Sequence, residues 1–134
     1  MFPYYGKIII MNRHKLREKL VFIVYNELLL NEIQNELLEE YNLTDDEYTL
    51  TFIKCFKDNK SDIINHLSKF LHKFEFKRLD LVEQAILIVA YIELKYVCLD
   101  KEIVMDEAIN IAKKYCKDGS YRFINGVLDN LCLS

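Results

Sequence analysis

Glycine and proline are scarce in this chain: its 134 residues contain three glycines and one proline. Tight turns depend on these two residue types, so the sequence argues against a β-sandwich or barrel with many short connections. The glycines stand at positions 6, 119 and 126, which leaves no place for a phosphate-binding loop or a dinucleotide-binding glycine fingerprint. Nucleotide-binding enzymes of those two kinds are therefore excluded.

Paired cysteines and long apolar runs are also missing. The four cysteines, at positions 55, 98, 116 and 132, form no C-x-x-C pair, which argues against a zinc site, a redox dithiol or a disulfide framework. The apolar run before Asn12 is too short for a signal peptide core, and the uncharged stretch 84–92 is too short to span a membrane. We therefore expect a cytoplasmic protein without a membrane segment.

What the chain does contain is enough apolar material for a core, since 51% of its residues are hydrophobic and 29% are charged, with a net charge of −3. A chain of this length buries roughly two-thirds of the surface that it exposes when unfolded. Apolar residues recur every three or four positions and no segment alternates with period two, so we expect an all-α protein. A single domain, residues 1–134, accounts for the length.

The predicted architecture is a compact bundle of about seven helices with a central buried fifth helix. Helix starts are expected at Thr44, which forms a capping box with Glu47, at Ser61 and at Asp80. The apolar spacing places the helices at about 13–30 and 33–41, around 50–56 and 63–71, at about 80–97, and around 105–115 and 123–131. The fifth of them has no polar face through its middle, so the other helices must surround it.

No residue pattern indicates catalysis or metal binding. His66 and His72 are six positions apart, which on a helix is not the one-turn spacing that chelates a metal. Asp45, Asp46 and Glu47 are better explained by a helix start, where the helix dipole favours acidic side chains, than by a cation site. The sequence therefore predicts no enzyme, no catalytic residue, no metal and no cofactor.

One local feature departs from the pattern of the other helix starts. The first predicted helix opens with five basic residues, opposed only by Glu18: Arg13, His14, Lys15, Arg17 and Lys19. Cations near a helix N-terminus oppose the macrodipole, at a cost of roughly 0.3–1 kcal/mol each when they are exposed. Such a tolerated cost suggests a function, and basic side chains at a helix end can bind a phosphate backbone. The alternative is an ordinary solvated face, and because the whole chain is acidic we expect any such binding to be local and modest.

From position 78 onward, three stretches resemble the NusB family of bacterial transcription antitermination factors. Residues 78–94 (RLDLVEQAILIVAYIEL) are similar to the family's central helix, and residues 106–115 (DEAINIAKKY) are similar to its next helix. Residues 123–129 (FINGVLD) resemble the family's F-V-N-G-V-L-D signature. The three stretches follow one another in the family's order and spacing. The resemblance implies an all-helical fold of seven helices, in agreement with the count above.

The resemblance also implies a function in the regulation of transcription. Members of the family bind the boxA element of ribosomal RNA leaders together with NusE, a small-subunit ribosomal protein, and join the RNA polymerase antitermination complex. The resemblance places the RNA against the basic N-terminal segment and the start of the last helix, where Ser120, Tyr121, Arg122 and Phe123 stand and Lys117 lies close by. The acidic residue that it assigns to the NusE-binding face is Glu83.

Two alternatives stay open at the level of the sequence. One is a diverged helical adaptor that keeps the protein-binding face without RNA binding, and the other is the NusB-like accessory domain fused to ribosomal RNA cytosine methyltransferases. The chain has no cofactor-binding domain, and Asp129 at the end of the signature favours a free-standing NusB-like protein. Phe123 is either a core residue or a base-stacking one. We expect Gly126 to allow close packing between helices.

Overall fold

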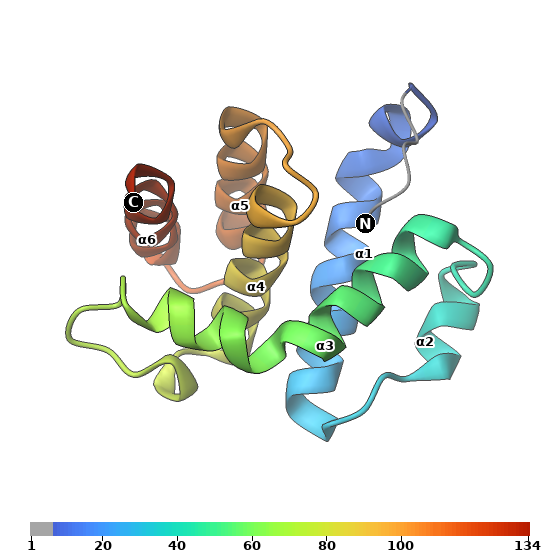
Figure 1. Cartoon of the computed structure of the whole chain (residues 1–134), viewed down its shortest axis with the longest axis horizontal. Helices are drawn as coiled ribbons and strands as arrows, with labels where there is room; N and C mark the ends of the chain where they lie inside the picture. Colours follow the sequence, from blue (N-terminus) through green and yellow to red (C-terminus); the bar gives the residue numbers. More distant parts are fainter. Residues whose placement is uncertain (1–6) are drawn as a thin grey trace.

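The computed structural model describes residues 7–134, with side chains described from residue 14 onward. This part of the chain forms six α-helices and one 3₁₀ turn, and it contains no strand (Figure 1). The helices are α1 (Lys7–Leu30), α2 (Asn35–Glu40), α3 (Glu47–Ser68), α4 (Leu81–Lys95), α5 (Lys101–Tyr115) and α6 (Ser120–Leu133), and the turn η1 is Phe76–Arg78. None of the helices so described is long and apolar enough to cross a membrane. The predicted all-α class is confirmed.

The predicted count of seven helices is wrong, because the third and fourth predicted helices are one. α3 runs without a break through Ser61 and Asp62, where the sequence suggested a new start. Its buried residues Phe52, Phe56, Ile63 and Leu67 keep one helical phase across that point. No glycine or proline interrupts the segment, so continuous packing overrides the local capping signal.

α3 also begins later than the suggested capping box. Its N-cap is Asp46, whose carboxylate accepts hydrogen bonds from the backbone N–H of Thr49 at 2.9 Å and from the Thr49 hydroxyl at 2.7 Å. Thr44 lies two residues before this cap and outside the helix. Either residue type can cap a helix, so the sequence alone did not decide between them.

α4 is the central helix of the bundle and corresponds to the predicted fifth helix. Every residue from Glu83 to Glu93 is buried. α1, α3, α5 and α6 all pack against it, as Figure 1 shows. The expected central buried helix is thus confirmed. Glu83 and Glu93 are carboxylates within it, and carboxylates this deeply buried need partners.

α5 and α6 pack side by side at one edge of the bundle (Figure 1). Asp100 caps α5 by accepting a hydrogen bond from the backbone N–H of Glu102 at 2.9 Å. Gly119 joins the two helices with a φ of 87°, in the left-handed region that glycine adopts at little cost. This short turn brings the start of α6 next to the end of α5, where Lys113 and Lys114 lie.

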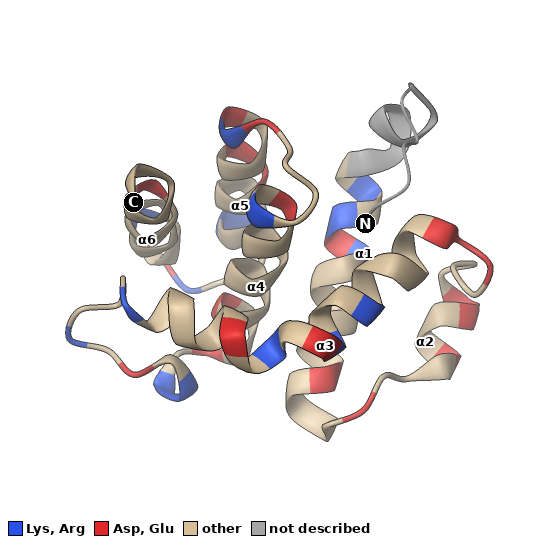
Figure 2. Cartoon of the chain, viewed as in Figure 1, with Lys and Arg blue, Asp and Glu red and all other residues tan. Residues whose placement is uncertain are grey.

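Charge is distributed unevenly over the helices. Residues 20–53 contain no Lys, Arg or His, and their acidic side chains lie in the second half of α1, on α2, at the start of α3 and on the connections between these helices (Figure 2). Basic side chains are found on the first half of α1, on the later part of α3, on α5 and around η1. A chain with a net negative charge therefore carries locally basic surfaces, as the sequence suggested.

Candidate RNA-binding face

The basic run of α1 does not lie at the start of the helix. Because α1 begins at Lys7, Arg13 is already in its second turn and the other basic residues of the run follow it. The helix dipole acts mainly within the first turn, so the expected conflict between this run and the macrodipole is absent. The side chain of Arg13 lies outside the described side chains, and its contact with RNA stays a prediction.

Arg17, one of the predicted RNA-binding residues, is buried. Its side chain is 3% exposed, and its Nε lies 2.8 Å from both carboxylate oxygens of Glu93 in α4, which is 2% exposed. Its Nη1 is 3.9 Å from a carboxylate oxygen of Glu107 in α5. Arg17 stands three positions before the buried Leu20, on the side of α1 that packs on α4. The arginine that was expected at the surface is instead part of the core.

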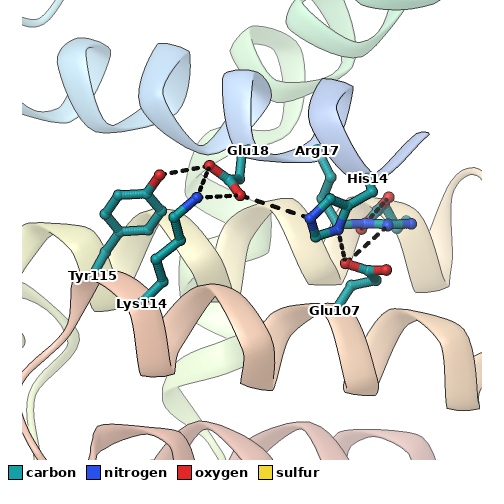
Figure 3. A network of polar contacts seen from close by, with 7 residues as sticks. His14, Arg17, Glu18, Glu107, Lys114 and Tyr115 are labelled. Carbon is teal, nitrogen blue, oxygen red and sulfur yellow. Dashed lines mark hydrogen bonds and ion pairs between the residues drawn. The ribbon is translucent and has the colours of Figure 1, made fainter. Parts of the chain in front are cut away.

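Three further contacts tie α1 to α5 at the surface (Figure 3). His14 Nδ1 lies 2.6 Å from a carboxylate oxygen of Glu107. Glu18 accepts hydrogen bonds from the Lys114 ammonium at 3.2 Å and from the Tyr115 hydroxyl. Burial raises the pKa of Glu18, but the hydrogen bonds from Tyr115 and Lys114 outweigh this effect, so its pKa lies below the ordinary value. Part of the positive charge on this face is therefore compensated within the protein.

A groove of about 350 Å³ beside this network brings cations and aromatic rings together. Its lining includes His14, Lys15, Lys19, Phe22, Tyr41 and Lys114. The Lys19 Nζ lies 5.6 Å from the centroid of the Tyr41 ring, and the Lys114 Nζ lies 5.2 Å from that of the Tyr115 ring. Lys15 is exposed. Such a mixture of cations and rings suits the phosphates and the bases of a single-stranded nucleic acid.

At the start of α6, the aromatic ring that lies between cations is that of Tyr121. The ring centroid of the half-buried Tyr121 lies 4.7 Å from the Lys113 Nζ and 5.1 Å from the guanidinium carbon of Arg122. Lys113 was not among the predicted residues. It belongs to the last turn of α5, and only the packing of α5 against α6 brings it to Tyr121.

A second cavity of about 350 Å³ is lined by residues around η1, the start of α4 and the turn between α5 and α6. Its lining includes Phe74, Arg78, Asp80, Glu83, Lys117 and Phe123. The Phe123 ring meets the exposed Phe74 ring edge to face, with 5.4 Å between centroids, and the Lys117 Nζ lies 3.4 Å from a carboxylate oxygen of Asp80. Phe123 is half-buried, so it has both a packing partner and a side open to the cavity.

Glu83 and Ser120 bind each other in the lining of this cavity. The Ser120 hydroxyl donates to one carboxylate oxygen of Glu83 at 2.7 Å, and the Asp80 backbone N–H donates to the other at 3.2 Å. Glu83 is 4% exposed and Ser120 is 3% exposed. Glu83 therefore presents no exposed carboxylate, because Ser120 at the start of α6 lies against it, and its place on the NusE-binding face stays a prediction. Its charge instead lies near the N-termini of both helices, where it is stabilising.

These observations define an all-helical protein in which cations lie against aromatic rings in the groove on α1 and at the start of α6. The sequence model of the NusB family matches residues 13–132. A transcription antitermination protein NusB of Campylobacter hominis is 34% identical over 125 residues, which cover 89% of this chain and 95% of the relative. Its counterpart in Bacillus mycoides is 33% identical over 126 residues, covering 90% and 97%. The solved structure of T. maritima NusB matches with a TM-score of 0.77 and 29% identity over 91% of each chain. The chain belongs to the NusB family.

Proposed function

We propose that this protein is an RNA-binding transcription antitermination factor that binds boxA-type leader RNA of ribosomal RNA operons together with NusE. Its relatives carry the name transcription antitermination protein, which describes a regulator rather than an enzyme. The factor acts as one NusB-like domain, residues 1–134, in the cytoplasm, and joins the RNA polymerase antitermination complex.

The observation that carries this proposal is the group formed by Lys113, Tyr121 and Arg122, in which two cations flank one partly open ring. Single-stranded RNA is held by rings that stack on its unpaired bases and by cations that neutralise its phosphates. The neighbouring Lys114 reaches the groove on α1. The end of α5 therefore connects the two groups of cations and rings into one face.

We assign direct RNA contacts to the accessible members of the predicted set and a supporting role to the buried ones. The direct contacts come from His14, Lys15, Lys19, Lys117, Tyr121, Arg122 and Phe123, and we assign one to Arg13 from its place in the basic run alone. Arg17 and Ser120 position α1 and α6 through their buried bonds to Glu93 and Glu83. The NusE-binding face depends on Glu83 in the same indirect way, through the arrangement of α4 and α6.

An electrophoretic shift titration with boxA RNA, in the presence and absence of NusE, tests this function. We expect the protein to shift the RNA, more strongly with NusE, and to lose affinity as salt rises because phosphate contacts release counterions. A scrambled RNA of the same length is the control for sequence preference. Absence of a shift in both conditions overturns the proposal.

A helical adaptor that binds protein but not RNA is the alternative, and the ion pairs on the α1 face favour it. Two cations of this region already have carboxylate partners, Lys114 with Glu18 at the surface and Arg17 with Glu93 in the core, and the His14 ring lies against Glu107. Fewer uncompensated charges weaken binding to a phosphate backbone. An adaptor retains NusE binding in a titration with labelled NusE while the RNA stays unshifted at every salt concentration.

A further inference from the structure

Gly126 is an exposed glycine in the interior of α6, and no packing contact within the described part of the chain explains it. A Cβ atom built at this position meets, beyond its chain neighbours and the backbone of its own helix, no atom of the described residues within 4 Å. The expectation that Gly126 allows close packing between helices is therefore wrong. Glycine in the middle of a helix is destabilising relative to alanine, because it loses more backbone freedom on folding. A cost without an internal benefit suggests that something outside the chain approaches the helix there.

The position of Gly126 connects it with the face described above. Arg122 stands four residues before it and Phe123 three, so all three share one side of α6. Arg122 lies against the Tyr121 ring, and Phe123 borders the cavity near η1. A chain bound at the start of α6 and continuing along the helix therefore crosses Gly126 next.

We propose that the sugar–phosphate backbone of single-stranded RNA crosses α6 directly over Gly126, an inference that rests on the function proposed above. The missing side chain lets the RNA approach the helix backbone closely, with a phosphate within reach of Arg122. The acidic residue on the following turn, Asp129, faces Lys101 at 3.6 Å, so its charge is compensated. The uncompensated charge of this face is that of Arg122, which suits an anionic chain rather than a basic protein segment.

The proposal predicts opposite changes in stability and in RNA affinity when Gly126 is replaced by alanine. The added methyl group meets no atom of the protein, and alanine favours the helix, so the melting temperature rises by about 2–4 °C. The same methyl group holds the RNA away from α6, so affinity falls. If Gly126 has no function, its replacement by alanine raises the melting temperature and leaves RNA affinity unchanged.

The experiment compares the parent with Gly126→Ala, with Gly126→Gln and with the control Ser61→Ala, using thermal unfolding and titration of the same boxA RNA. Ser61 is exposed in the middle of α3, and its replacement also improves helix propensity. We expect Gly126→Ala to weaken RNA binding by about tenfold and Gly126→Gln by more, as expected when a close contact is overfilled. Ser61→Ala leaves RNA affinity unchanged.

The possible failures can be told apart. If the parent does not bind RNA, the proposed function fails and this inference fails with it. If the parent binds RNA and both Gly126 variants bind equally well, the path over α6 is wrong while the function stands. If the variants keep RNA affinity but lose NusE binding, a protein covers Gly126 and the RNA path is again overturned.

Discussion

The Arg17 Nε lies 2.8 Å from both carboxylate oxygens of Glu93, and both side chains are almost fully buried. The pair joins α1 to the central helix α4. Arg17 belongs in sequence to the basic run that was expected to bind RNA, but this pair places it in the core and not on the surface. A basic residue next to other basic residues can thus have a purely structural position.

Replacing Arg17 by alanine is expected to destabilise the protein by about 3–5 kcal/mol, because the buried Glu93 carboxylate loses its cation. The matched variant Lys15→Ala changes an exposed cation of the same helix, so its unfolding free energy stays within about 0.5 kcal/mol of the parent. Urea unfolding followed by circular dichroism measures both values.

For RNA binding, we expect replacement of the exposed Lys15 to have a larger effect than replacement of the buried Arg17. Lys15→Glu weakens binding and reduces its dependence on salt, because a phosphate contact is lost. Arg17→Ala, measured where it is still folded, binds RNA with nearly the affinity of the parent. If Arg17→Ala is as stable as the parent but no longer binds RNA, Arg17 contacts RNA directly and its assignment as a positioning residue is wrong.

We expect removal of the Tyr121 ring to weaken mainly RNA binding, and removal of the Phe123 ring to lower the stability of the fold. Tyr121→Ala weakens RNA binding by about 1–3 kcal/mol, the value typical of one stacked base, with little change in stability. Tyr121→Phe keeps the ring and most of the affinity. Phe123→Ala loses its edge-to-face contact with Phe74, and because Phe123 is half-buried the loss of stability is less than the roughly 3–5 kcal/mol of a core phenylalanine. Unchanged RNA affinity in both alanine variants supports the adaptor.

Ala85 tests the central position of α4. It is 0% exposed, so Ala85→Leu is expected to overpack the bundle and cost about 1–3 kcal/mol of unfolding free energy. Asn65→Leu, at an exposed position of α3, is the control and changes stability by no more than about 0.5 kcal/mol. Equal melting temperatures for the parent and Ala85→Leu contradict the tight packing around α4.

The sequence was most informative about α4, because the apolar pattern that indicates burial lies within that one helix. The apolar residues on every side of α4 predicted its burial, because no other arrangement keeps them from water. The sequence was least informative where a local signal competes with packing. Ser61 and Asp62 look like a helix start, yet the apolar phase of α3 continues through them. The difference between seven helices and six comes from that one segment.

The candidate site was predicted in part, for a related reason. Exposed cations such as Lys15 can be recognised from sequence, but partners that lie far apart along the chain cannot. Glu93 is 76 positions away from Arg17, and 37 positions separate Glu83 from Ser120. Lys113 meets Tyr121 only because α5 and α6 pack together. Such pairs form only when the helices pack together, and they determine which charged side chains remain exposed.

Glu83 and Ser120 are expected to be energetically coupled. Glu83→Ala removes the acceptor of two hydrogen bonds and Ser120→Ala removes one donor, so both variants are destabilised. The double variant costs less than the two single ones together, by about 0.5–3 kcal/mol, since they remove one shared contact. NusE binding weakens alike in both single variants. Loss of NusE binding in Glu83→Ala alone contradicts the indirect role.

His66 is expected to make stability depend on pH. Its Nδ1 lies 2.6 Å from the hydroxyl of Tyr91 in α4. Burial, then the charges of Lys69 and Lys95, hold the pKa of His66 below its ordinary value. The unfolded chain therefore takes up this proton first as pH falls, so stability is present above the unfolded pKa of about 6.5 and declines as pH drops from there towards the folded pKa.

Unfolding free energies of the parent and of His66→Gln, measured by urea titration between about pH 7.5 and about pH 5, test this dependence. Both proteins retain His14 and His72, so the contributions of these two residues cancel in the difference. At the highest pH of this range we expect the parent to have the larger unfolding free energy, because the glutamine variant loses the contact with Tyr91. The difference in unfolding free energy between the two proteins becomes smaller as pH falls, because only the parent has a His66 whose protonation favours the unfolded chain. A difference that is constant across the range contradicts the lowered pKa of His66.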